Sequence, residues 1–138
     1  MLGVKQAAHH IAVCACDGCP EMGTGPARFR LGPLPAGATL VRLPCPRAFE
    51  PKRILELLLE GAEGVLIVGC AEGSGIVSDY EVEERLKVLR CLLRQVGLAD
   101  VRIASEWMPR WRWGDVARSV EDLRAALAGV SGLQRPAL

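Results

Sequence analysis

Short apolar runs alternate with amphipathic segments along most of this chain. The runs at residues 11–15, 39–43, 64–70 and 101–105 are rich in β-branched residues, which predicts four strands. The stretch Val65-Leu66-Ile67-Val68 is apolar without interruption. This pattern is typical of a central parallel strand that is covered on both faces.

Three longer segments carry apolar residues at the spacing of a helix that buries one side. They begin near Pro51, Asp79 and Asp115, and Gly61 and Gly97 are expected to end the first two. The positions expected to face the core are Ile54, Leu55, Leu58 and Leu59 in the first helix, Val82, Leu86, Leu89, Leu93 and Val96 in the second, and Val116, Val120, Leu123 and Leu127 in the third.

The order of these elements predicts the fold class. Between the first two strands, residues 26–37 contain three prolines and two glycines, so only a short irregular helix is expected there. The remaining strands and helices alternate. This alternation predicts a single α/β domain with a four-stranded parallel sheet of the doubly wound, flavodoxin-like kind and right-handed crossovers. We expect residues 1–128 to form this domain and residues 129–138 to be a loose C-terminal tail.

Composition and net charge limit the kinds of partner that the chain is expected to bind. The chain has 138 residues, half of them hydrophobic, and a net charge of +1, which gives no electrostatic reason to bind nucleic acid or a membrane surface. No apolar run is long enough to span a bilayer, and Met1–His10 contains no apolar run typical of a signal peptide. We therefore expect a cytoplasmic protein, whose clustered cysteines indicate metal binding or catalysis rather than disulfides.

Four of the six cysteines follow predicted strands. Cys16 and Cys19 form a C-x-x-C motif after the first strand, Cys45 follows the second between two prolines, and Cys70 ends the third. Because the carboxyl ends of parallel strands meet at one edge of a sheet, we expect the four thiols to gather there. Cys14 lies inside a strand and Cys91 inside a helix, and we interpret both as small buried core residues.

Four converging thiols are compatible with three kinds of site. Thiolates from separate strand ends suit an iron–sulfur cluster. A structural zinc site usually has two C-x-x-C motifs, and this sequence has one. The C-x-x-C motif alone also suits a redox dithiol. No Ser-His-Asp or paired-carboxylate arrangement is apparent, and His9 and His10 are expected to be solvated near a frayed end.

The segment EGAEGVLIVGC at residues 60–70 resembles a known family, together with the C-x-x-C motif and Glu106-Trp107 after the fourth predicted strand. Over roughly residues 10–127 the chain resembles the family of methyl-viologen-reducing hydrogenase delta subunits. This family is also called the hydrogenase iron–sulfur subunits. The resemblance implies a [2Fe–2S] cluster and no catalytic residue. By motif match its ligands are Cys16, Cys19, Cys45 and Cys70. One position departs from the family pattern, because Gly75 stands where a further cysteine is usual.

The resemblance also implies a role in a complex. It implies an electron-transfer subunit between a flavin- or hydrogenase-type module and a heterodisulfide-reductase-like flavoprotein subunit, within a hetero-oligomeric anaerobic redox complex. The alternatives are a cluster-free or zinc-bound adaptor subunit of such a complex, and a C-x-x-C dithiol oxidoreductase. Because Trp and Arg are enriched at binding hot spots, we expect the loop after the fourth strand to contact a partner. Its residues are Arg110, Trp111, Arg112 and Trp113.

Overall fold

The structure is a computed structural model, and it describes residues 9–16, 33–43, 49–70, 79–108 and 114–129. The strands are β1 (Ile11–Cys16), β2 (Ala38–Leu43), β3 (Gly64–Cys70) and β4 (Ile103–Met108). The helices are α2 (Pro51–Leu59), α3 (Asp79–Gln95) and α4 (Val116–Ala128), and a 3-10 turn, η3 (Asp100–Arg102), precedes β4.

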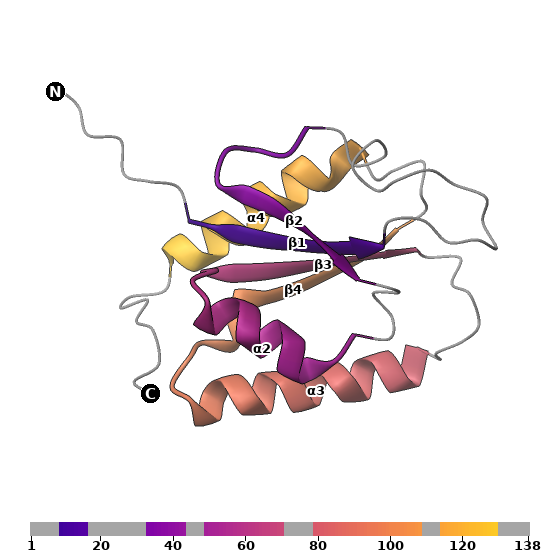
Figure 1. Cartoon of the computed structure of the whole chain (residues 1–138), viewed down its shortest axis with the longest axis vertical. Helices are drawn as coiled ribbons and strands as arrows, with labels where there is room; N and C mark the ends of the chain where they lie inside the picture. Colours follow the sequence, from indigo (N-terminus) through magenta and orange to yellow (C-terminus); the bar gives the residue numbers. More distant parts are fainter. Residues whose placement is uncertain (1–8, 17–32, 44–48, 71–78, 109–113, 130–138) are drawn as a thin grey trace, which may run out of the picture.

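The strands form one parallel sheet in the order β2-β1-β3-β4. Their arrowheads lie toward the same side of the view in Figure 1. The α2 and α3 helices lie on one face of the sheet and α4 on the other (Figure 1). The predicted α/β domain with a four-stranded parallel, doubly wound sheet is therefore confirmed.

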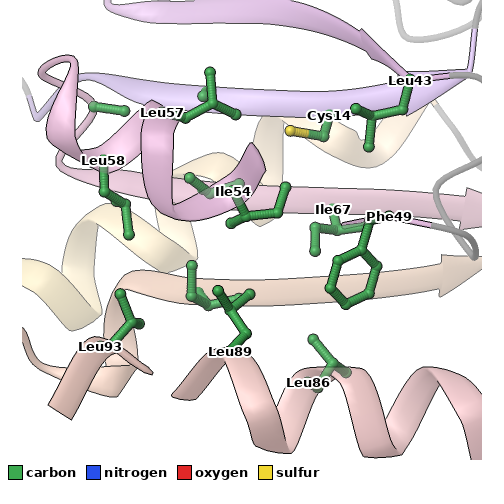
Figure 2. Packing of buried hydrophobic residues seen from close by; sticks show 14 of the residues in the cluster. Cys14, Leu43, Phe49, Ile54, Leu57, Leu58, Ile67, Leu86, Leu89 and Leu93 are labelled. Atoms are coloured by element: carbon green, nitrogen blue, oxygen red, sulfur yellow. The ribbon is translucent and has the colours of Figure 1, made fainter. Parts of the chain in front are cut away.

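Alternating positions of the central strands fill two separate cores. On β1 and β3, Ala12, Cys14, Val65 and Ile67 pack with α2 and α3, as Figure 2 shows for part of this cluster. The intervening positions pack with α4, and they are Ile11, Val13, Ala15, Leu66 and Val68. Both central strands are therefore buried on both faces, as the continuous apolar run at residues 65–68 predicted for β3.

Both predicted ends of the fourth strand and the predicted inner face of α2 differ from the structure. The fourth strand begins at Ile103 rather than Val101, because residues 100–102 form the 3-10 turn. It also extends to Met108, so Glu106 and Trp107 lie within the strand and not after it. On α2, Leu57 is buried although the predicted face left it out. The predicted inner faces of α3 and α4 are confirmed, with Val96 partly buried.

A polar cluster joins the starting ends of all four strands, and we call it the amino-edge clasp (His9, Glu63, Arg102 and Arg124). The guanidinium of Arg124, on α4, donates from Nε to the His9 carbonyl at 3.1 Å and from Nη2 to the Ala36 carbonyl just before β2. Arg102 donates from Nη1 to the Glu63 carbonyl at 2.9 Å. Both arginines are buried.

Glu63 completes this clasp through its side chain. Its Oε2 lies 2.6 Å from Nδ1 of His9, and its Oε1 accepts the backbone N–H of His10 at 3.2 Å. The expectation that His9 is merely solvated is therefore wrong, because Glu63 lies directly before β3, the neighbour of β1. Such a contact depends on strand order, which the residues around His9 do not encode.

The proposed C-terminal tail, residues 129–138, lies outside the described residues apart from Gly129. Across the residues that are described, no helix is both long and apolar enough to cross a membrane.

Candidate metal centre at the carboxyl edge of the sheet

Two neighbouring strands of the sheet both end in cysteine. Cys14 lies opposite Ile67 in the register of β1 and β3. Cys16 is two residues beyond Cys14, and Cys70 is three residues beyond Ile67. Along the strand direction, the backbone of Cys70 therefore lies one residue further than that of Cys16. Neighbouring strands lie about 4.8 Å apart. The backbones of the two residues therefore lie close together at the carboxyl edge of the sheet.

The strand that Cys45 follows in the sequence, β2, lies on the other side of β1. The end of β2, Leu43, is opposite Cys16. In the sequence Cys45 follows Leu43 by two residues and Cys19 follows Cys16 by three. Both Cys19 and Cys45 lie outside the described residues. The predicted side-by-side arrangement of the three strands is confirmed, and the four-cysteine ligand set stays a prediction.

The other two cysteines have different surroundings. Cys14 is fully buried in the core between β1 and α2 (Figure 2), and burial raises the pKa of its thiol to about 12 against the opposing charge of Arg53. Because a metal binds the thiolate, this environment makes Cys14 a poor ligand. Cys91 is exposed on α3, so the expectation that it is buried is wrong. The Nε2 atom of Gln95 lies 3.9 Å from its sulfur.

An aromatic ring lies beside the end of β3. Trp107 of β4 is opposite Gly69 in the sheet register, and Gly69 directly precedes Cys70. A Cβ built on Gly69 would lie 1.8 Å from Cζ3 and 1.9 Å from Cε3 of the Trp107 ring. The indole therefore occupies the space that a side chain at position 69 would need. A glycine inside a strand can indicate such a close approach, and this was the available sequence signal.

The predicted partner-binding residues lie outside the described residues, and they are Arg110, Trp111, Arg112 and Trp113. Gly75, which replaces a family cysteine, also lies outside them. Within the described ranges, no group of three or more His, Cys, Asp or Glu side chains is placed to hold a metal ion. Any four-thiol centre at this edge must therefore include residues beyond those ranges.

A separate hollow of about 370 Å³ lies on the outer side of β4, between this strand and α4. Its charged lining residues are Arg90, Asp100, Glu106 and Asp122, while Ile103, Ala104 and Leu123 add apolar surface. Asp100 already lies 3.8 Å from Arg94. None of the described residues that line it is a cysteine or histidine, so this lining differs in chemistry from the carboxyl edge.

Comparison with known proteins identifies several relatives. Over residues 11–131 the sequence matches the family described as "Methyl-viologen-reducing hydrogenase, delta subunit". An F420-non-reducing hydrogenase iron–sulfur subunit of Archaeoglobus profundus is 32% identical over 101 residues, which cover 72% of this chain and 74% of that protein. The corresponding iron–sulfur subunit of the vhc F420-non-reducing hydrogenase of Methanococcus voltae is 30% identical over 97 residues, 69% of this chain and 64% of that protein.

A much larger protein contains a similar region. It is one subunit of the ferredoxin/F(420)H(2)-dependent CoB-CoM heterodisulfide reductase of Methanosarcina acetivorans, and it is 29% identical over 92 residues, which cover 65% of this chain but only 11% of that protein. The hydrogenase relatives, in contrast, match over most of their length. Because the family match covers residues 11–131, the chain belongs to the family of methyl-viologen-reducing hydrogenase delta subunits.

Proposed function

We propose that this chain is an electron-transfer subunit of a redox complex and carries a [2Fe–2S] cluster bound by Cys16, Cys19, Cys45 and Cys70. The observation that carries the proposal is the pair of cysteines, Cys16 and Cys70, that end adjacent parallel strands. The hydrogenase relatives, which are named as iron–sulfur subunits, support it independently. The chain itself supplies no catalytic residue in this proposal.

The residues at the carboxyl edge fit such a cluster. Thiolates are its usual ligands, and four cysteines follow strands that lie side by side in the sheet. Cys14, a nearby fifth thiol, is fully buried in the core that packs with α2 and α3, and the proposal leaves it out of the ligand set. When bound, a [2Fe–2S] cluster accepts and releases one electron at a potential set by its ligands, nearby hydrogen bonds and exposure to solvent. The protein's part is to hold the thiolates and to control access of water.

The partner in this proposal is a heterodisulfide-reductase-like flavoprotein subunit, with a flavin- or hydrogenase-type module as the second redox partner. The similarity to part of a heterodisulfide reductase supports this choice, because the same kind of domain occurs there within a larger redox protein. We propose that the contact is made by Arg110, Trp111, Arg112 and Trp113, which follow β4 in the sequence. A cytoplasmic location belongs to the same proposal.

Metal analysis after anaerobic purification tests the function. We expect about two irons and two sulfides per chain, with a visible absorption spectrum that bleaches on reduction. Zinc without iron would favour the adaptor subunit instead. A metal-free protein with a reversible Cys16–Cys19 disulfide would favour the dithiol oxidoreductase. Either of these two results would contradict the electron-transfer proposal.

The proposed contact requires a separate binding measurement. The double variant Trp111→Ala/Arg112→Ala should dissociate faster from the isolated complex, because hot-spot truncation acts mainly on the dissociation rate. The iron content of the subunit should stay unchanged. Assembly as tight as that of the parent protein would remove this segment from the interface.

A further inference from the structure

The carboxyl edge has an apolar lining on the face covered by α2 and α3. Leu43 ends β2 and Phe49 precedes α2, so the two residues bracket Cys45 in the sequence, and both are buried. Trp107 packs against the same cluster and lies over Gly69, directly before Cys70. On this face, large apolar side chains therefore lie at the end of β2, before α2 and over Gly69.

Trp107 differs from the other two residues in its exposure. Leu43 and Phe49 are 8% and 2% exposed, whereas Trp107 is only partly buried. Its ring thus packs on the core and still meets solvent at the edge of the sheet. The indole fills the space that a side chain at position 69 would need, so it lies directly on the backbone of β3. The position of this ring is fixed by the backbone of the strand that carries Cys70.

We propose that Trp107 is a positioning residue for the cysteine centre, whose indole lies on Gly69 and screens the end of β3 from water. This inference rests on the proposed function. A [2Fe–2S] cluster with four thiolate ligands becomes more negative when it is reduced, and water stabilises the more highly charged form. Exclusion of water by the indole therefore lowers the reduction potential. The same cover slows the approach of water and chelators to the iron.

The test compares ring removal with ring replacement in the anaerobically purified protein. Trp107→Leu removes the ring and keeps an apolar side chain, and Trp107→Phe retains a smaller ring. Val88→Ala is the control, because Val88 is 51% exposed on α3 and distant in sequence from every proposed ligand. The measurements are the reduction potential of the cluster, the rate of iron loss to a chelator, and circular dichroism as a check of folding.

We expect Trp107→Leu to raise the potential and to speed iron loss several-fold, Trp107→Phe to lie between this variant and the parent, and Val88→Ala to match the parent. A merely structural role would lower thermal stability without moving the potential. An unchanged potential in folded, iron-loaded Trp107→Leu would overturn the inference. If that variant does not fold, an unchanged potential and iron-loss rate in Trp107→Phe would overturn it equally. A parent protein without iron would instead overturn the proposed function, so the two failures are distinct.

Discussion

The two edges of the sheet are built from different chemistry. At the amino edge, Arg102 and Arg124 of the clasp donate hydrogen bonds to backbone carbonyls before β1, β2 and β3. At the carboxyl edge, β1 and β3 end in cysteine beside an aromatic ring. Polar groups that pair within the chain stabilise a fold, whereas the carboxyl edge of a parallel sheet is where ligands bind. The comparison therefore separates residues that hold the domain together from residues that we propose for function.

The sharpest test of this separation is the removal of a proposed ligand. Cys70→Ser and Cys16→Ser should each lose most of the bound iron, because a cluster of this type needs four ligands. The metal-free proteins should unfold at nearly the same temperature as the metal-free parent. The measurements are iron content and thermal unfolding, with exposed Cys91→Ser as the matched control. Full iron content in Cys70→Ser would remove this edge from the proposed centre.

The reverse effect is expected at the amino edge. Arg124→Met should lower the free energy of unfolding by about 3 kcal/mol, because it removes charged hydrogen bonds to the carbonyls of His9 and Ala36. Urea unfolding of the metal-free protein measures the loss. Arg118→Met, at an exposed position of the same helix, should change stability little. A drop in iron content of the folded Arg124→Met protein, at a temperature well below its unfolding, would show that the two edges are not independent.

The contact between Gly69 and Trp107 makes a smaller and more specific prediction. Gly69→Ala should destabilise the metal-free protein by about 1–3 kcal/mol, because the new methyl group overlaps the indole and the ring must move. In the presence of Trp107→Ala the same change should cost much less. A double-mutant cycle by urea unfolding gives this coupling. Equal costs of Gly69→Ala in both backgrounds would contradict the close approach of the ring.

The smallest effect concerns pH and the clasp. Partial burial acts to raise the pKa of Glu63, but hydrogen bonds from His9 and the His10 N–H, with the charges of His9 and Arg102, outweigh it and hold the pKa below its usual range. A lowered pKa in the folded state stabilises the protein above the unfolded value of about 4.3, and this contribution is lost as pH falls through the folded value. Because the Glu63 side chain is 38% exposed, we expect less than about 1 kcal/mol.

Comparison of the parent with Glu63→Gln isolates this contribution. Their difference in unfolding free energy should be largest near neutral pH and should shrink as the solution is acidified below about pH 4. Glu60→Gln is a suitable control, since Glu60 is exposed and lies 3.6 Å from Arg53 outside the clasp. A difference that stays constant from neutral to acidic pH would mean that ionised Glu63 does not contribute through the clasp.

The sequence by itself determined the local features of this protein. Continuous apolar runs specified buried strands, and helical spacing specified the inner faces of α3 and α4, because both patterns report burial within one segment. The same reasoning placed Cys16 and Cys70 at strand ends and Cys14 in the core. Parallel strands align their carboxyl ends, so a shared edge followed without knowledge of the exact register.

Only the tertiary structure decided which distant residues meet. The limits of β4, the clasp from His9 to Arg124 and the position of Trp107 over Gly69 all depend on strand order and register. Residues in these contacts lie far apart in the chain, and the helix and strand periodicities carry no information about them. The exposure of Cys91, in contrast, agrees with the inner face of α3 that the helical spacing specified, because position 91 lies on the opposite side of that helix. Local periodicity thus determined the elements, and long-range packing determined the surroundings of the site.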